Sequence, residues 1–191
     1  MANVPPIQNP GPSSTSRKKP NVALIVFSVV AVAVCVPCMA IPAAVLFPVF
    51  QEAKVAAQKT LSVSNLKQQA TGVALYTADN DDRLPLASNW RAATASYVDD
   101  AAVFDFPPVR EGWQYAFYGP VSGLVRSELA DPRDTPLIFE SRATGSPTVG
   151  GVSDFPREGP WRPAEFNMAF VDSSVRTIPV DWLPPAGVPV Q

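Results

Sequence analysis

The strongest constraint in this 191-residue sequence is a stretch of 29 residues, 22–50, that contains no charged side chain. A helix of about 20 apolar residues is long enough to cross the hydrocarbon core of a bilayer. A core helix of a globular protein would instead show polar positions every third or fourth residue. The stretch therefore predicts a transmembrane helix over residues 22–50, with the lipid bilayer as its partner.

The residues that precede this stretch predict its orientation. Residues 1–21 are rich in Pro, Ser and Asn, which is typical of a disordered leader, and they end in the basic cluster Arg17, Lys18 and Lys19. Positive charge beside a span stays in the cytoplasm, so the rest of the chain is predicted to be extracytoplasmic. The apolar run is longer than the core of a signal peptide and no Ala-x-Ala site follows it, which favours a retained single-pass anchor.

Residues 51–78 predict an amphipathic continuation of the same helix. They contain no proline and are rich in Ala, Gln, Lys and Leu, which favour helices. Apolar residues recur at spacings of three and four at Val63, Leu66, Ala70 and Val73. No Gly/Ser linker separates this segment from the apolar run, and Pro85 with its preceding acidic cluster ends the helical pattern.

Residues 79–182 predict an extracytoplasmic α+β domain, followed by a Pro-rich tail over residues 183–191. A short helix is expected over 88–98, capped by Ser88 or Asn89. Strands are expected over 113–118, 135–141, 166–172 and 174–180, the last two joined as a hairpin through Asp172 and Ser173. The alternation of Phe166, Met168 and Phe170 indicates a half-buried strand, and residues 148–154 are expected to form a flexible loop. The predicted fold is a long N-terminal helix packed on a small antiparallel sheet.

Composition excludes several classes of function. There is no histidine, which removes His-ligated metals and His-dependent catalysis. From residue 51 onward there are 12 Lys and Arg against 17 Asp and Glu, a net charge of −5, which argues against nucleic-acid binding. Both cysteines, Cys35 and Cys38, lie in the apolar run, where they are expected to be small apolar residues; intermolecular pairing or acylation is the alternative.

Asp79, Asp81 and Asp82 form the most conspicuous acidic cluster. An EF-hand loop requires Gly at its sixth position and Glu at its twelfth, and neither register supplies them. A solvated turn that ends the helix is the favoured interpretation, with a calcium site of another type as the alternative.

Other candidate chemistry is weak in the sequence. Glu140, Glu165 and Asp172 could supply a glycosidase pair in number, but no spacing selects two of them. Ser141 beside Glu140 lacks a nucleophile-elbow pattern. The four tryptophans are expected to fill a small core rather than to line a ligand groove: Trp90, Trp113, Trp161 and Trp182. No catalytic, cofactor-binding or metal-binding residue is assigned, and no enzyme activity is expected.

Seven segments in the same order resemble the type IV pilin-like, or pseudopilin-like, proteins, over residues 45–178. These proteins combine a prepilin-type N-terminal helix with a C-terminal domain of unknown function. The similar segments are LFPVFQEAK, SNLKQ, the Asp-rich stop DNDDRLP, NWRAATASYV, WQYAFYG, DTPLIFES and FNMAFVDSSV. In the last of these, Ser173 and Ser174 stand where the family has Gly and His. The segment FDFP (104–107) is similar to a Phe-x-Cys-Pro element of the family, with Phe106 in place of the cysteine.

The resemblance implies a pilin-like fold and a non-enzymatic envelope or surface component, as a minor subunit of a pilus or type II secretion-like assembly or as a permanently anchored derivative. Other pilin-like subunits would be its partners. The chain departs from the family at Val26 and Ala31, where a cleavage-site glycine and an assembly glutamate are usual. The alternative is a membrane-anchored module that binds a glycan or Ca²⁺.

Overall fold

The computed structural model describes residues 21–108, 111–142, 148–161 and 164–185, without the side chains of residues 35–45. Nearly all of the predicted leader, the end of the predicted tail and the side chains of Cys35 and Cys38 lie outside the described residues. The chain divides into two compact units, Met1–Pro48 and Val49–Gln191.

The first helix, α1, extends over Val22–Asp79 and so contains the boundary between the two units. Its hydrogen bonding begins at the carbonyl of Asn21, which accepts from the backbone N–H groups of Leu24 and Ile25. No loop separates the apolar run from the amphipathic segment, in agreement with the missing linker in the sequence. Within the described part of the chain, no helix combines the length and the apolar character needed to cross a membrane.

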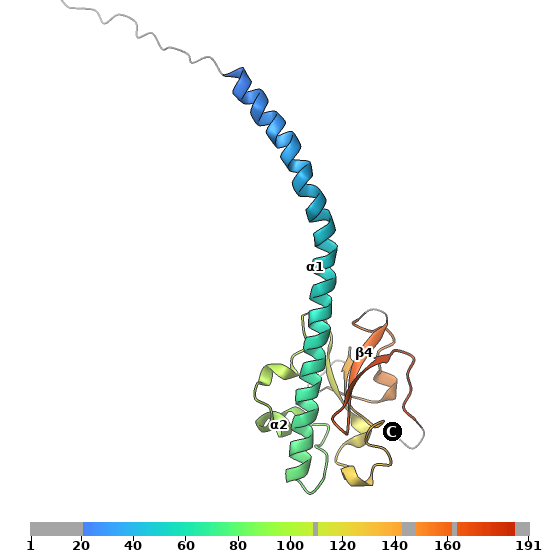
Figure 1. The fold of residues 1–191 in the computed structure, drawn as a ribbon. Helices are drawn as coiled ribbons and strands as arrows, with labels where there is room; N and C mark the ends of the chain where they lie inside the picture. Colours follow the sequence, from blue (N-terminus) through green and yellow to red (C-terminus); the bar gives the residue numbers. More distant parts are fainter. Residues whose placement is uncertain (1–20, 109–110, 143–147, 162–163, 186–191) are drawn as a thin grey trace, which may run out of the picture. The chain divides into compact units, whose positions relative to one another are not determined.

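In the second unit, α1 runs beside the sheet (Figure 1), and the burial of its side chains is amphipathic, as its spacing predicts. Leu66, Ala70 and Val73 are buried, whereas Val63 is only half-buried. The buried face also contains polar side chains, which the apolar spacing does not reveal: Ser62, Asn65, Gln69 and Thr77. Gly72 allows close approach of the segment after α2, because a Cβ at this position would lie 2.9 Å from Cγ1 of Val98.

Five strands form one sheet in the order β3-β1-β2-β4-β5. Their bounds are Gln114–Tyr118 (β1), Pro136–Ser141 (β2), Val149–Gly150 (β3), Glu165–Phe170 (β4) and Val175–Pro179 (β5). All pairs are antiparallel except β1 with β3, which is parallel. The four predicted strands are therefore confirmed, but the expectation of a purely antiparallel sheet is wrong. The predicted flexible loop over 148–154 is also wrong in part, because it contains β3.

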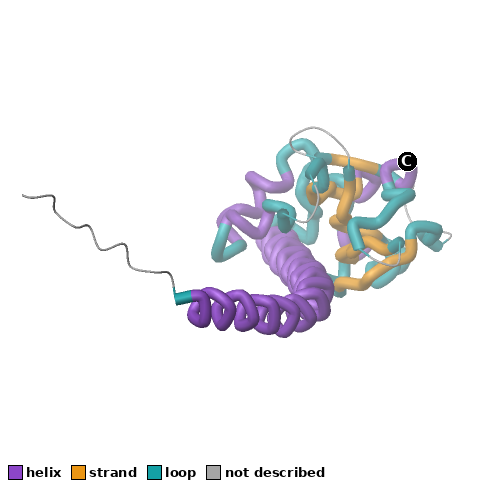
Figure 2. The backbone as a smooth tube through the Cα atoms, turned by 90° about the horizontal axis from the view of Figure 1, so that it is seen from above, coloured by secondary structure: helices purple, strands orange, loops and turns teal. Residues whose placement is uncertain are grey.

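The strands gather beside α1 in the second unit (Figure 2). Every residue of β2 is buried, so both faces of this strand are covered. In β4, Asn167 and Ala169 are as fully buried as the alternating Phe166, Met168 and Phe170, so the expectation of a half-buried strand is wrong. α1 covers one face of the sheet, and the aromatic rings of Phe155 and Trp182, from loop segments, pack on the other.

The predicted helix over 88–98 is shorter and less regular than expected. It consists of α2 over Trp90–Thr94 followed by the 3₁₀ helix η1 over Ala95–Tyr97. Asn89 is the N-cap residue but its side chain makes no capping bond, so the predicted cap is wrong. The other 3₁₀ helices are Ala101–Phe104 (η2), Gly119–Val121 (η3), Arg126–Glu128 (η4) and Val152–Asp154 (η5).

The predicted hairpin between β4 and β5 is confirmed, and its turn contacts α1. Ser173 has φ 65°, in the left-handed region that favours glycine. Its carbonyl accepts a 2.7 Å hydrogen bond from Lys67 Nζ, and its hydroxyl donates to the carbonyl of Ala70. The turn therefore attaches the edge of the sheet to the helix.

Candidate functional site

The site begins with a row of polar side chains that crosses four strands. Tyr115 of β1 lies opposite Glu140 of β2, and Asn167 of β4 lies opposite Thr177 of β5. The pairing of β2 with β4 continues the row, because Phe139 lies opposite Met168 and the next pair is Glu140 with Asn167. Cross-strand partners project from the same face of a sheet, so all four side chains face the same layer.

Helix α1 completes the site from above this face. The Ser62 hydroxyl donates to Oε1 of Glu140 and is 3.0 Å from the Tyr115 hydroxyl. One turn earlier, Lys59 Nζ forms a 2.8 Å ion pair with Oε2 of Glu165. Lys59 and Ser62 are three residues apart and lie on one helical face, so both can reach the sheet.

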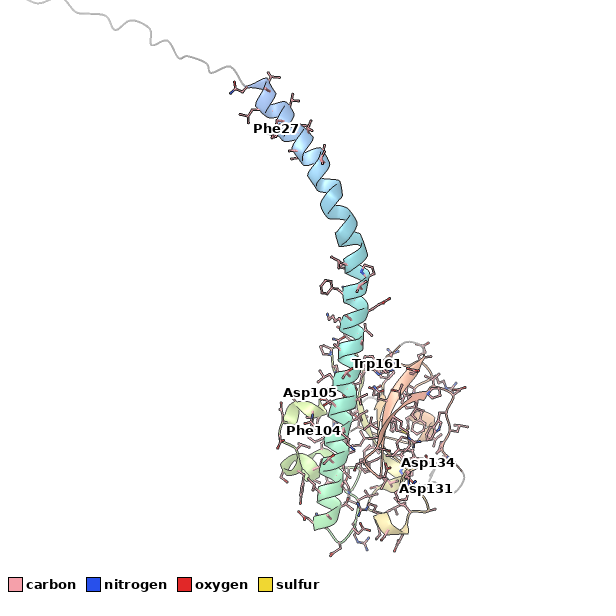
Figure 3. The ribbon with its side chains drawn as sticks, in the orientation of Figure 1. Phe27, Phe104, Asp105, Asp131, Asp134 and Trp161 are labelled. Atoms are coloured by element: carbon pink, nitrogen blue, oxygen red, sulfur yellow. The ribbon has the colours of Figure 1, made fainter. Side chains whose placement is uncertain are left out.

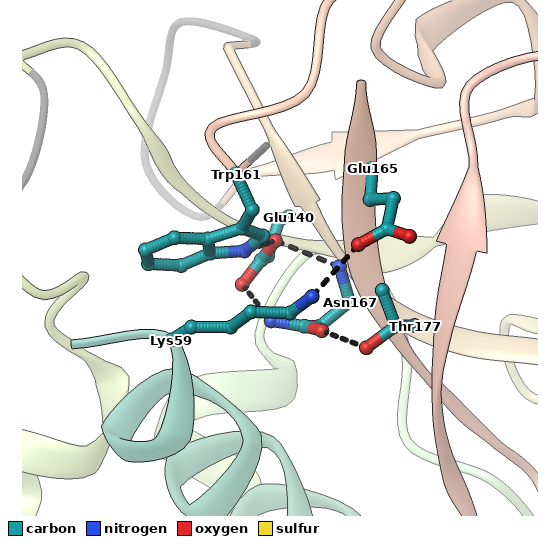
Figure 4. Close-up of polar contacts among 6 residues, drawn as sticks. All are labelled: Lys59, Glu140, Trp161, Glu165, Asn167 and Thr177. Atoms are coloured by element: carbon teal, nitrogen blue, oxygen red, sulfur yellow. Dashed lines mark hydrogen bonds and ion pairs between the residues drawn. The ribbon is translucent and has the colours of Figure 1, made fainter. Parts of the chain in front are cut away.

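Glu140 is the centre of the hydrogen bonding, and its side chain is fully buried. Its Oε2 accepts from the Trp161 indole N–H and from the backbone N–H of Asn167, both at 2.7 Å. Its Oε1 accepts from Nδ2 of Asn167 at 2.8 Å and from the Ser62 hydroxyl. The row ends where the Thr177 hydroxyl donates to Oδ1 of Asn167 at 2.8 Å (Figure 4).

The electrostatics of this carboxyl are unusual because its four direct donors carry no positive charge. Burial raises the pKa of Glu140 above its ordinary value, and the hydrogen bonds from Ser62, Asn167 and Trp161 oppose that rise. Burial also raises the pKa of Tyr115, so its hydroxyl remains protonated at neutral pH. The site therefore contains one titratable carboxyl held by neutral donors from α1, from β4 and from the segment before it.

The three carboxylates proposed as glycosidase candidates do not share an open site. Glu140 is fully buried, whereas Glu165 is half-buried and paired with Lys59. Asp172 lies in the β4–β5 turn, where it accepts from the Ser174 backbone N–H. Two surface cavities, of about 450 and 340 Å³, lie elsewhere, and neither is lined by Glu140 or Glu165. Substrate contact with Glu140 would thus require the structure to open.

The acidic cluster at the end of α1 has different structural partners. Asp79 accepts from the Tyr97 hydroxyl, whereas Asp82 pairs with Arg126 at 3.1 Å and accepts from the Ser127 backbone N–H. These contacts to Asp82 lower its pKa. Asp81 is exposed, and both Asp81 and Asp82 have positive φ. Among the described residues, no three acidic, His or Cys side chains are grouped so that they could hold a metal ion.

The tryptophans pack in the described structure, and Trp161 in addition donates to Glu140. Trp90, Trp113 and Trp161 are buried, which confirms the prediction of a core role for these three, and Trp182 is half-buried against Phe155 and Phe170. Ser141 is buried and donates to the carbonyl of Asp154.

Sequence reasoning missed the residues that surround Glu140. Ser62 and Asn167 are common polar residues in segments interpreted from their apolar neighbours alone. The available signal was the polar position within a run of strand-forming residues, Glu140 after PLIF, since a buried charge needs partners.

Comparisons with protein-family models, with curated proteins and with solved structures found no match to this chain. The pilin-like resemblance therefore stays a prediction from the sequence.

Proposed function

We propose that this protein is a non-enzymatic, pilin-like envelope component that is permanently anchored in a membrane by α1. The N-terminus would be cytoplasmic and the second unit extracytoplasmic. The observation that carries this proposal is the composition of α1, in which a charge-free segment passes without a loop into a segment that is buried against a sheet.

The first half of α1 supports the anchor because its described apolar side chains have no protein cover. Phe27 is 76% exposed and projects from the helix (Figure 3). Thirteen large apolar residues in the described parts of 22–50 are each more than half exposed: Val22, Leu24, Ile25, Val26, Phe27, Val29, Val30, Val32, Val34, Leu46, Phe47, Val49 and Phe50. Apolar surface of this extent marks a membrane or protein contact.

The second half supports the pilin-like part of the proposal. A long helix that packs one face on a sheet is the arrangement that the resemblance implies. The departures at Val26 and Ala31 favour a chain that keeps its leader, because the cleavage glycine and the assembly glutamate are replaced. Contact with other pilin-like subunits, in a minor assembly role, would then depend on apolar helix packing rather than on a buried charge.

Membrane extraction tests the anchor. The full chain is expected to stay in the membrane pellet after alkaline carbonate treatment. The double substitution Val30→Lys and Val34→Lys should release much of it, because each Lys at the centre of a span costs about 3 kcal/mol. Leu61→Lys is the matched control, since Leu61 is exposed in the second unit and its replacement should leave the chain in the pellet.

Mass spectrometry of the mature protein tests processing separately. A retained N-terminal leader is expected. A new N-terminus at Phe27 would contradict permanent anchoring and favour a processed subunit. Release of the unsubstituted chain by carbonate would contradict the anchor itself.

A further inference from the structure

The contacts around Glu140 join α1 to the sheet at a particular place. Residues 51–57 of α1 are exposed, and Ser62 is the first fully buried residue after them. The hydrogen bond from Ser62 to Glu140 and the ion pair from Lys59 to Glu165 therefore hold the first buried turns of the helix. These turns, residues 58–66, are called the clasp segment below.

We propose that Glu140 is a proton-dependent switch that fastens the clasp segment to the sheet when it is protonated and loosens it when it is ionised. This inference concerns the second unit alone and does not rest on the proposed membrane anchor.

The hydrogen bonds allow both protonation states, which makes a switch chemically reasonable. Three of the four donors are N–H groups, from Trp161 and Asn167, and they cannot reverse. The fourth partner is the Ser62 hydroxyl. It can donate a hydrogen bond to Oε1 when Glu140 is ionised, or accept one from Oε1 when Glu140 is protonated there. The Ser62 and Tyr115 hydroxyls are 3.0 Å apart and either can donate, so the hydrogen bond between them can reverse when Ser62 changes from donor to acceptor toward Glu140.

The ionised state is the weaker one because the charge is buried without a cation. The charged or titratable groups on the surrounding elements are Lys59 of α1, Arg91 of α2, Asp105 after η2, Tyr115 of β1 and Glu165 of β4. Lys59 is paired with Glu165, and Arg91 donates to the backbone carbonyl of Tyr115. Neither cation contacts Glu140, so ionisation leaves a charge held only by dipoles.

The direction of the pH effect follows from this cost. Burial raises the pKa of Glu140 in the closed state, in which the clasp segment packs on the sheet, whereas in the opened state, in which it does not, the pKa should return to its ordinary value. The closed state then binds more protons than the opened state between these two values. The contribution of Glu140 to the stability of the closed state is therefore fully present below the opened-state pKa. It is lost as the pH rises through the closed-state pKa.

Hydrogen–deuterium exchange of the full chain, corrected for the intrinsic pH dependence of exchange, measures the switch. Protection of the clasp segment should fall about tenfold per pH unit between the two pKa values and become constant above them. Peptides over residues 69–79 should not follow this fall. Glu140→Gln should abolish the pH dependence, whereas Glu165→Gln, the same change on the neighbouring carboxyl, should retain it.

A second readout uses the unsubstituted protein and does not depend on a variant that folds. The indole N–H of Trp161 donates directly to Glu140, so its NMR resonance should titrate with a midpoint at the closed-state pKa, which is the pH above which protection becomes constant. An invariant resonance between pH 4 and 9 would overturn the proposal, as would a fall in protection that persists in Glu140→Gln. Equal loss of protection over residues 69–79 would also overturn it, because the opening would then be global.

Discussion

At the scale of single residues, a buried carboxyl dominates this structure. Glu140 accepts four hydrogen bonds from three residues, and its loss affects each of them. A buried donor left without an acceptor costs about 1–3 kcal/mol, which is a large part of the stability of a small domain. The packing of α1 on the sheet therefore depends in part on the hydrogen bonds of a buried carboxyl.

Glu140→Gln should lower the free energy of unfolding by about 1–3 kcal/mol. The Gln oxygen can replace Oε2, but its amide nitrogen then faces Nδ2 of Asn167, another donor. The difference from the unsubstituted chain should be largest at acidic pH. It should shrink as the pH rises through the folded pKa, where Glu140 loses its stabilising contribution.

Urea unfolding of both chains over a pH series measures this difference. Ser64→Ala, at an exposed position of α1, is the control and should have little effect. A difference that grows with pH would contradict a raised pKa.

The positive φ of Ser173 predicts an unusual order of stabilities. Ser173→Gly should be more stable than Ser173→Ala by about 1 kcal/mol, because only Ala has a Cβ in the left-handed region. Neither variant retains the hydroxyl bond to Ala70, so their difference isolates the backbone. Thermal unfolding of the two variants gives the result. At Ser174, where φ is not positive, the order should be reversed.

At the scale of elements, α1 has one face fixed by the sheet and another that is exposed. Leu66 is fully buried in the core cluster, whereas Leu61, more than one turn away, is 49% exposed. The same helix therefore offers two leucines with opposite environments. Their comparison tests which face packs.

Leu66→Ala should lower the free energy of unfolding by about 2–5 kcal/mol through lost burial and a cavity. Leu61→Ala should change it by less than about 0.5 kcal/mol, because the side chain is already largely in water. Denaturant unfolding monitored by tryptophan fluorescence gives both values. Similar losses for the two variants would show that the assigned face is wrong.

Much of the element structure was predictable because it depends on local pattern. The spacing of Leu66, Ala70 and Val73 indicated the buried face of α1, and β-branched and aromatic runs indicated four strands. β3 was not predictable, since Val149 and Gly150 are too short a segment to show a strand pattern, and the strand is defined by its pairing with β1. The Glu140 site was not predictable either, because Ser62 and Asn167 meet it only after distant segments pack.

At the scale of the whole molecule, the boundary between the two units lies within α1, so the proposed membrane anchor can be tested by comparing the two parts of the chain. The charge-free part of the helix belongs mainly to the first unit, and the amphipathic part belongs to the second. If a bilayer surrounds the first part, cysteines there and in the second unit should differ in their access to reagents that cannot cross lipid.

Cysteine labelling in intact cells tests whether α1 spans a membrane with the second unit on the outer side. Cys35 and Cys38, the two cysteines of the chain, lie within the charge-free run, and the exposed Ser96 offers a site in the second unit. A membrane-impermeant maleimide should label Ser96→Cys in a Cys35→Ser, Cys38→Ser background. It should leave Cys35 and Cys38 of the unsubstituted chain unlabelled until the membrane is dissolved. Labelling of Cys35 or Cys38 in intact cells, or labelling of Ser96→Cys only after lysis, would contradict this arrangement.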